Sequence, residues 1–190
     1  GAWLADTWEW NGAAWTQRSP AHSPPQRCCS GFGVDLARTR VVLFGGQGGA
    51  ADLNDTWEYD GIDWVQRSTT QAPSPRRLPG FAFDVTRGGL VLLGGGPGSA
   101  VMAGDMWHWN GANWLPLQPA HLPAARWGFG MVTDFARGRI LLHGGSNTWG
   151  SQPATFRDTW SWDGTDWTLL PTTVAPPPVL SFGMTYDWVR

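Results

Sequence analysis

Short apolar segments, separated by turns rich in glycine, proline and asparagine, recur along the whole chain. Residues 41–44 (VVLF) and 90–93 (LVLL) are continuous apolar runs, and residues 140–143 (ILLH) follow the same plan. A run of this length without alternation is typical of a β-strand that is covered on both faces. In residues 55–59 (DTWEY) aromatic and polar positions alternate, which indicates a strand with one buried face.

The pattern repeats with a period close to 50 residues. An Asp-Thr-Trp tripeptide at residue 6 recurs at residues 55 and 158, and as Asp-Met-Trp at residue 105, so the steps are 49, 50 and 53 residues. An Asp-x-x-Arg sequence keeps the same steps, and three glycine pairs hold the same register. Unrelated residue types that keep one phase over several copies indicate a repeat protein. The structural repeat positions are Gly45, Gly46, Gly94, Gly95, Gly144 and Gly145; Trp8, Trp57, Trp107 and Trp160; Trp15, Trp64, Trp114 and Trp167; and Asp35, Arg38, Asp84, Arg87, Asp134, Arg137, Asp187 and Arg190.

Each unit contains four expected strands. The first begins with glycine, the second is the apolar run, the third contains the Asp-Thr-Trp motif, and the fourth begins at a second repeated tryptophan. Asn-Gly or Asp-Gly lies between the third and fourth strands and supplies the positive φ angles that tight hairpins need. The expected first strands are residues 31–34, 80–83, 130–133 and 183–186.

Composition supports an all-β fold. The chain of 190 residues holds 15 Trp, 26 Gly and 15 Pro, no Lys, and only Glu9 and Glu58, a composition that disfavours helices. A four-stranded sheet of about 50 residues cannot bury both of its faces alone, whereas copies stacked around an axis can. We therefore predict a β-propeller of four-stranded antiparallel blades. The repeated tryptophans should pack between the blades, and the first-strand glycines should let the blades converge.

Charge and spacing exclude several classes of protein and site. The formal net charge is −2, and the 13 basic residues, all arginine, form no stripe that would suit nucleic acid. No apolar run approaches the roughly 18 residues that membrane insertion needs. The two cysteines, Cys28 and Cys29, are adjacent, a spacing that neither staples a fold nor makes a metal site. No pair of the four histidines has a metal-ligand spacing, so we expect no metal and no cofactor.

The glycine pair after an apolar strand, followed by an Asp-Thr-Trp-x-aromatic strand and a spaced tryptophan, resembles the kelch repeat. Residues 6–12 (DTWEWNG) resemble the bacterial variant of this repeat, whose propellers include galactose-oxidase-like proteins. The resemblance covers nearly the whole chain and implies a partial propeller array of about four repeats. It implies little about function, because kelch propellers serve many roles.

The array is incomplete at both ends, and two interpretations remain open. Residues 1–18 supply the last two strands of one blade, 27–67, 76–117 and 126–170 each make a full blade, and 179–190 supply the first strand of a further blade. The chain is either a segment of a longer propeller, which we favour, or a small four-bladed ring with one three-stranded blade. In both cases the missing apolar strand leaves an unpaired edge that favours self-association.

The loops at one end of the expected blades vary in length and sequence, and we call this the variable end; the other is the turn end. Binding residues lie disproportionately on variable loops held by a rigid scaffold, so the variable end is the expected binding surface. The variable loops are residues 47–53, 96–104 and 146–157 within blades, and 19–26, 68–75, 118–125 and 171–178 between blades.

Three arginines, Arg27, Arg76 and Arg126, hold one register and enter the first strands from the variable end. Guanidinium groups there would suit a carboxylate or phosphate ligand, so they are candidate binding residues. The alternative is that each arginine binds loop carbonyls or an Asp and braces the junction between blades. The fourth copy has Val179 at this position.

Trp127 and Trp149 depart from the repeat, which makes them better candidates for contact with a ligand than the tryptophans at repeat positions, for which we expect packing. Trp127 stands where other copies have Cys28 and Arg77, and Trp149 lies in the longest variable loop.

The Asp of the Asp-x-x-Arg turns respects the symmetry of the array, which predicts a turn cap and not a catalytic acid. The position of Glu58 changes from copy to copy (E, E, H, S), which predicts an exposed site.

These observations predict a non-catalytic scaffold that presents its variable end to a protein or a glycan. The alternative is a propeller segment of a secreted carbohydrate-active enzyme or galactose-oxidase-like protein whose catalytic residues lie outside this chain. Such an oxidase would need copper held by Tyr and His, whereas Tyr59 and Tyr186 both stand at repeat positions. The resemblance, together with the use of arginine without lysine, implies an exported or cell-surface bacterial protein.

Overall fold

Short antiparallel β-strands make up the fold. The computed structural model describes residues 3–98, 101–149 and 154–187, and these contain 14 strands and no α-helix. The strands are β1 (Thr7–Trp10), β2 (Trp15–Arg18), β3 (Gly31–Asp35), β4 (Arg40–Gly48), β5 (Ala51–Tyr59), β6 (Trp64–Arg67), β7 (Gly80–Asp84), β8 (Gly89–Leu93), β9 (Met106–Trp109), β10 (Trp114–Leu117), β11 (Gly130–Asp134), β12 (Arg139–His143), β13 (Thr159–Trp162) and β14 (Trp167–Leu170).

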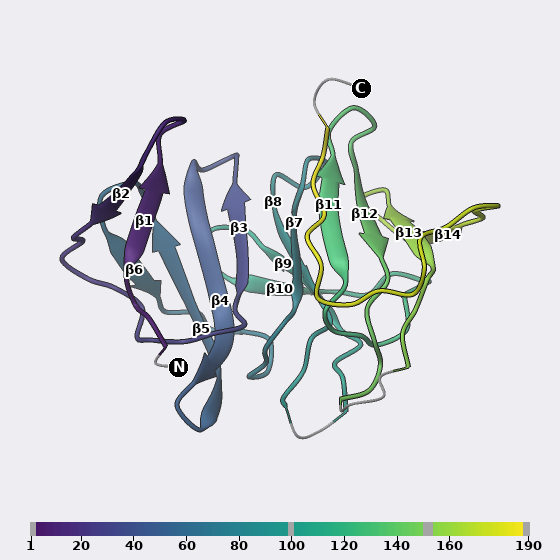
Figure 1. Cartoon of the computed structure of the whole chain (residues 1–190), viewed down its shortest axis with the longest axis horizontal. Helices are drawn as coiled ribbons and strands as arrows, with labels where there is room; N and C mark the ends of the chain where they lie inside the picture. The colour runs from purple at the N-terminus through teal and green to yellow at the C-terminus, as the bar shows by residue number, and fades with distance from the viewer. Residues whose placement is uncertain (1–2, 99–100, 150–153, 188–190) are drawn as a thin grey trace.

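The strands form three four-stranded sheets and one hairpin, each in chain order. The first blade is β3-β4-β5-β6, the second β7-β8-β9-β10 and the third β11-β12-β13-β14, and β1 pairs with β2 as the N-terminal hairpin. β7 lies against both β3 and β11, so the first strands of the blades meet at the centre and the sheets spread outward (Figure 1). The predicted all-β architecture of antiparallel four-stranded blades is confirmed.

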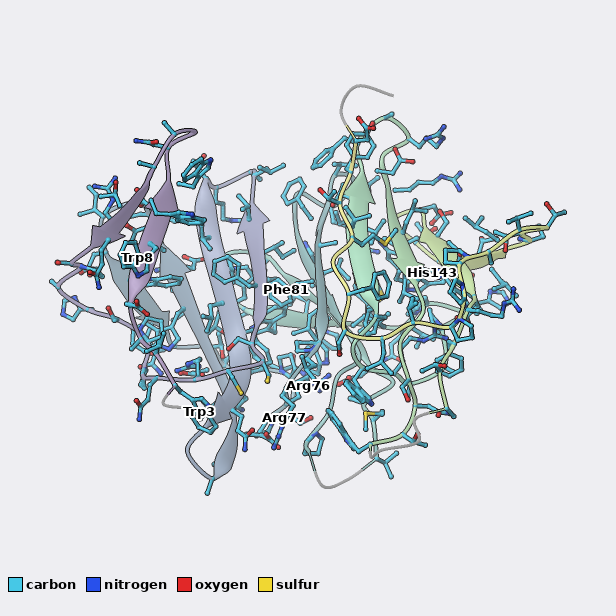
Figure 2. The ribbon with its side chains drawn as sticks, viewed as in Figure 1. Trp3, Trp8, Arg76, Arg77, Phe81 and His143 are labelled. Atoms are coloured by element: carbon cyan, nitrogen blue, oxygen red, sulfur yellow. The ribbon has the colours of Figure 1, made fainter. Side chains whose placement is uncertain are left out.

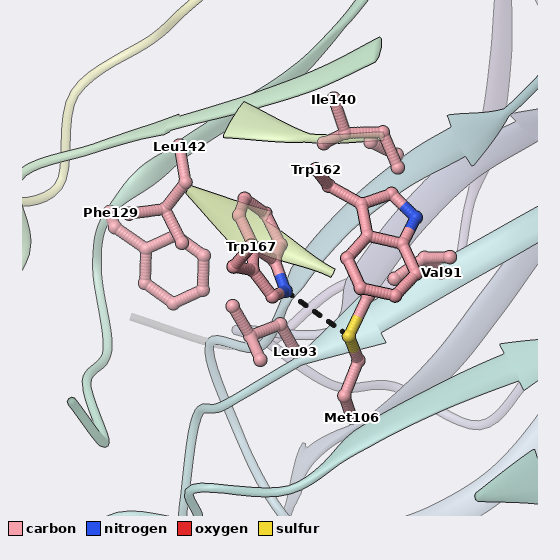
Figure 3. Close-up of a cluster of buried hydrophobic side chains, with 9 residues drawn as sticks. Val91, Leu93, Met106, Phe129, Ile140, Leu142, Trp162 and Trp167 are labelled. Carbon is pink, nitrogen blue, oxygen red and sulfur yellow. Dashed lines mark hydrogen bonds between the residues drawn. The ribbon is translucent and has the colours of Figure 1, made fainter. Parts of the chain in front are cut away.

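The repeated tryptophans that begin the fourth strands of the three blades pack between neighbouring sheets, as predicted. The prediction is wrong for Trp8 and Trp15 of the N-terminal hairpin, which are 48% and 63% exposed because no further sheet among the described residues covers them. Trp64, Trp114 and Trp167, which begin the fourth strands, are at most 5% exposed. Each donates its indole N–H to the third strand of the preceding sheet: Trp64 to Thr7 Oγ1 at 3.0 Å, Trp114 to Thr56 Oγ1 at 2.9 Å, and Trp167 to Met106 Sδ at 3.2 Å. Figure 3 shows the last of these bonds within the apolar cluster between the second and third blades.

A glycine at the start of each first strand permits the close approach of the blades. A Cβ atom on Gly80 would overlap the ring of Phe129, which belongs to the following unit. The predicted role of the first-strand glycines is therefore confirmed at the junction between the second and third blades.

The C-terminal segment departs from the prediction. Residues 183–186 were expected to form a first strand, but the structure assigns no strand there. The reason is that a strand needs a hydrogen-bonded neighbour, and no strand of the described residues pairs with this segment. The segment nonetheless lies on the third blade, because a Cβ on Gly130 would meet Phe182 and Met184.

The two ends of the array lie on opposite sides of the molecule (Figure 1). In the described part of the chain, no strand pairing joins the C-terminal segment to β1, whose only pairing is with β2. The sheets therefore form an open fan, and the ring closure of the four-bladed alternative is not seen. The described residues include no helix of the length and hydropathy required to cross a bilayer.

Candidate binding site

The turn end is built from carboxylate caps. Within each Asp-x-x-Arg turn the backbone N–H of the arginine donates to the Asp side chain, as from Arg38 to Asp35 at 3.2 Å and from Arg87 to Asp84 at 3.1 Å. The third copy repeats the bond between Arg137 and Asp134 at 3.2 Å. The structural role expected for these Asp residues is confirmed in the three copies; Arg190, in the fourth, lies outside the described residues.

The variable end lies opposite, at the bottom of Figure 1, where β4 continues into β5 and where the second and third strands of the other blades are joined. The first of these connections is a strand extension, because the pairing of β4 with β5 resumes after a bulge between Phe44 and Gly46 and continues to Gly48. In the other two blades the described residues of the corresponding connections (96–98, 101–104, 146–149 and 154–157) lie outside the strands. This end of the molecule therefore differs from blade to blade.

The three candidate arginines lie in buried ion pairs with the Asp of the Asp-Thr-Trp motif. The side chains of Arg27, Arg76 and Arg126 are 5%, 0% and 1% exposed. Arg126 donates from its two terminal nitrogens to the two carboxylate oxygens of Asp158 at 2.7 and 2.9 Å, the bidentate geometry that suits guanidinium best. Arg27 bonds Asp55 and Arg76 bonds Asp105 in the same way.

Arg27 and Arg126 each make four side-chain hydrogen bonds, and Arg76 makes five. Arg76 donates to Asp105 twice, to the carbonyls of Gly94 and Ser74, and to the Ser74 hydroxyl, which accounts for all five guanidinium N–H groups. The structure therefore supplies the partners expected for the alternative role, in which each arginine binds an Asp and loop carbonyls and braces the junction between blades. Ligand binding by these side chains stays a prediction, and it would require the ion pairs to open.

The ion pairs control the acid–base state of the carboxylates. Burial alone raises the pKa of Asp55, but hydrogen bonds from Arg27 and from the Trp57 indole outweigh it and hold the pKa below its ordinary value. The pKa values of Asp105 and Asp158 are lowered by the same balance of burial and hydrogen bonds. All three carboxylates are therefore ionised at neutral pH and serve as structural anions.

The backbone of the same arginine joins neighbouring units. The N–H of Gly46 in the first blade donates to the carbonyl of Arg76 at 2.9 Å, and the N–H of Gly95 in the second blade donates to the carbonyl of Arg126 at 2.9 Å. In the last copy the N–H of Gly145 donates to the carbonyl of Val179 at 2.8 Å. The joint between units is therefore a main-chain contact that persists where the arginine is missing.

Trp127 and Trp149, the other sequence candidates, are brought together. Their ring centroids are 4.3 Å apart and their planes meet at 19°, a stacked pair. The Trp127 indole N–H donates to the Thr148 carbonyl at 2.9 Å. Among the described residues the buried indole nitrogen of Trp149 has no hydrogen-bond partner. The pair thus combines partly exposed aromatic surface with an unused donor.

The residue that directly follows each of the three arginines varies from blade to blade. The sequence analysis selected only Trp127 at this position as a candidate binding residue. Cys28, Arg77 and Trp127 occupy it, and each makes an antiparallel bridge to the segment that follows the glycine pair of its own blade. Arg77 donates to Asp52 Oδ1 and to Gln47 Oε1, both at 2.8 Å, and lies beside Arg76 at the variable end (Figure 2). The available signal was a change of side-chain type at a fixed backbone position.

Three of the four histidines have polar side-chain partners among the described residues. The backbone N–H and the ring Nδ1 of His22 both contact Asp63, at 2.7 Å each, and His121 has the same pair of contacts with Asp166. His143 Nδ1 lies 2.9 Å from Thr159 Oγ1, and the His143 side chain is buried. Across the described ranges, no three His, Cys, Asp or Glu side chains gather in a way that could hold a metal ion.

Comparison of the chain with models of protein families, and with curated proteins, gave no match. The candidate site therefore rests on the geometry alone. It comprises the Trp127–Trp149 stack of the third blade and Arg77, which holds in the second blade the position that Trp127 holds in the third. The arginine–aspartate pairs, such as that of Arg126 with Asp158, lie in the same units.

Proposed function

We propose that this chain is a kelch-type propeller scaffold that binds a protein or glycan ligand at its variable end and has no catalytic role of its own. The observation that carries the proposal is the Trp127–Trp149 stack at 4.3 Å. The stack lies where two repeat-breaking residues meet on a rigid array, whereas the other units place different residues in the same register. Binding sites are commonly loop residues supported by such a scaffold.

Stacked indoles suit a ligand with both apolar and polar groups. Their ring faces offer apolar area to a sugar face or to a peptide side chain, and aromatic residues lose little conformational entropy on binding. The Trp149 indole N–H is buried and has no partner among the described residues, so a ligand oxygen could accept from it only after a change of the Trp149 rotamer. The hydrogen bond from Trp127 to Thr148 fixes one member of the pair in advance, which lowers the cost of binding.

The test is a screen of glycan and peptide arrays, followed by calorimetric titration of the hits. We expect Trp127→Ala and Trp149→Ala to weaken binding by about 2 kcal/mol each, the scale of a binding hot spot. Ile62→Ala is the control, because Ile62 is 80% exposed and lies in the turn between β5 and β6, outside the variable end. Equal loss in all three variants, or no loss in the first two, would contradict the proposal. Circular dichroism and the thermal midpoint report whether each variant is folded.

A second property, self-association through the N-terminal hairpin, is supported by a different observation. Trp10 and Trp15 are 52% and 63% exposed. Their register equivalents in the first blade, Tyr59 and Trp64, are each 5% exposed, because the preceding sheet covers them. We propose that the hairpin uses this uncovered aromatic face to contact a second copy of the chain.

A further inference from the structure

The two cysteines form a close pair of thiols at the start of the first blade. Cys29 Sγ donates to Cys28 Sγ across 2.9 Å, and both residues are half-buried. The equivalent positions in the next two units hold Arg77 with Leu78, and Trp127 with Gly128. The thiol pair is therefore a feature of one unit and not a requirement of the repeat.

The backbone holds the two thiols in place. The N–H of Cys28 donates to the Gln47 carbonyl at 3.0 Å, and the Gln47 N–H donates back to the Cys28 carbonyl at 2.8 Å. The carbonyl of Cys29 accepts from the N–H of Leu78, in the next unit, at 2.7 Å. Cys29 itself has a φ of 62°, the left-handed region that Gly128 occupies in the third unit. Such a position persists only where the surroundings fix it, so the thiols are preorganised.

Both cysteines line a cavity of about 450 Å³ between the segment that leads into β1 and the first blade. Asp6, Thr7, Arg27 and Ser30 also line it, and each of these side chains already has a hydrogen-bond partner within the protein. The two thiols are therefore the polar side chains of the cavity that are paired only with each other. Most of the remaining wall is apolar: Leu4, Trp8, Pro24, Phe32, Leu43 and Trp64.

A ligand for this cavity must be thiophilic, must bind two sulfur atoms on one centre, and must carry an apolar group. Sulfur ligands select soft acceptors. We propose that Cys28 and Cys29 form a bidentate site for trivalent arsenic compounds that carry an apolar organic substituent. Two As–S bonds form, the oxygen of the arsenous group leaves as water with both thiol protons, and arsenic stays trivalent, so no oxidant or reductant is needed. The organic group then occupies the apolar part of the cavity.

The acid–base state of the pair separates this reaction from simple alkylation. Burial, and then the hydrogen bond to Cys28, raise the pKa of the Cys29 thiol to about 11. The thiolate is the nucleophile in alkylation, so iodoacetamide should react slowly with Cys29 at neutral pH. The condensation with an arsenous oxide returns both thiol protons as water and releases no net proton, so the raised pKa slows this reaction but does not weaken the final binding at neutral pH.

The test uses phenylarsine oxide and the full reduced chain. We expect one phenylarsenic group per chain in the intact mass, with loss of one water, released by a dithiol but not by an excess of monothiol. Cys28→Ser and Cys29→Ser should each abolish this dithiol-specific adduct. An adduct that persists in either variant, or that a monothiol removes, would overturn the proposal.

A second comparison separates the folded cavity from the mere adjacency of two cysteines. A peptide of residues 24–34 has the same thiols without the cavity, and we expect the folded chain to bind at least about tenfold more tightly because the phenyl group is buried. Equal or weaker binding by the folded chain would show that the fold contributes nothing. Phe32→Ala, which opens the cavity wall, should weaken binding without changing the stoichiometry, while Ile62→Ala, outside the cavity and 80% exposed, should not. Equal effects of these two variants would also count against the site.

Discussion

Arg76 belongs to two blades at once. Its guanidinium donates to Asp105 in the second blade at 2.5 and 2.8 Å, while its backbone N–H and carbonyl bond Leu53 and Gly46 of the first blade at 3.0 and 2.9 Å. The side chain therefore organises its own blade, and the main chain fixes that blade to its neighbour. Loss of the side chain should therefore affect the second blade without removing the main-chain bonds to the first.

Loss of the Arg76 side chain should destabilise the fold. In Arg76→Met the Asp105 carboxylate loses its cation, and breaking a buried pair costs about 3 kcal/mol or more; we expect the lower end, because the Asp105 side chain is 40% exposed. Urea unfolding followed by tryptophan fluorescence measures the change. Arg137→Met is the matched control: its side chain is 73% exposed, and its pair with Asp134 should contribute less than about 1 kcal/mol. Similar losses in the two variants would refute the special role of the buried pair.

The same pairs predict acid sensitivity. The pKa values of Asp55, Asp105 and Asp158 are lowered in the folded chain, so their ionised forms stabilise it above the unfolded-state value of about 4. This stability is lost as the pH falls below that value and through the lower folded-state pKa. The free energy of unfolding should fall modestly between pH 7 and about pH 5, because burial lowers the pKa of His108 in the folded chain, and then more steeply as the three aspartates protonate. The fall should be shallower in Arg76→Met, and an unchanged slope would argue against the assignment.

A methyl group at the centre of the fan should be costly, and the chain supplies its own control. Gly80→Ala places a Cβ against the Phe129 ring, and overpacking of this kind costs about 1–3 kcal/mol. Gly183 holds the same register position, but no atom lies within 4 Å of its added Cβ, so Gly183→Ala should change the stability by less than about 0.5 kcal/mol. Chemical denaturation measures the free energy of unfolding of both variants. Equal losses of stability would contradict the close approach of the first strands.

Removal of the exposed indoles should reduce self-association. We expect sedimentation equilibrium of the chain to give a mass above that of a monomer, and Trp10→Ala combined with Trp15→Ala to lower it toward the monomer. Ile62→Ala, another exposed apolar side chain, at 80%, should leave the mass unchanged. A dispersed monomer at all concentrations before any substitution would remove the basis for hairpin-mediated contact.

Much of the fold follows from the sequence because each predicted strand has its partner in the next hairpin of the same unit. Residues 183–186 show the limit of that reasoning: their pattern matches a first strand, yet no strand forms without a neighbour. The position of Glu58 shows a second limit. We expected it to be exposed because it varies, but Glu58 is 3% exposed and accepts the Trp109 indole N–H at 2.9 Å. A position that varies between copies can thus still be buried, since Glu58, His108 and Ser161 share it and are 3%, 7% and 2% exposed.

The candidate site was predictable only in part. The departure of Trp127 and Trp149 from the repeat marked them, but their stacking depends on the path of the 146–157 loop, which no local pattern sets. For Arg27, Arg76 and Arg126 the sequence allowed both an external anion and an internal Asp, because guanidinium suits either one equally. The choice is made by tertiary placement, which brings Asp55 to Arg27 across 28 residues.

The main-chain contact between Gly145 and Val179 has a consequence for how such an array can change. Where arginine is replaced by valine, the amide–carbonyl bond is kept at 2.8 Å. A contact made by peptide groups does not depend on the type of side chain that the residue carries. The neighbouring loops can therefore differ in sequence while the spacing of the units is preserved. The side chains at the surface of one unit can therefore change while the main-chain bonds between the units stay the same.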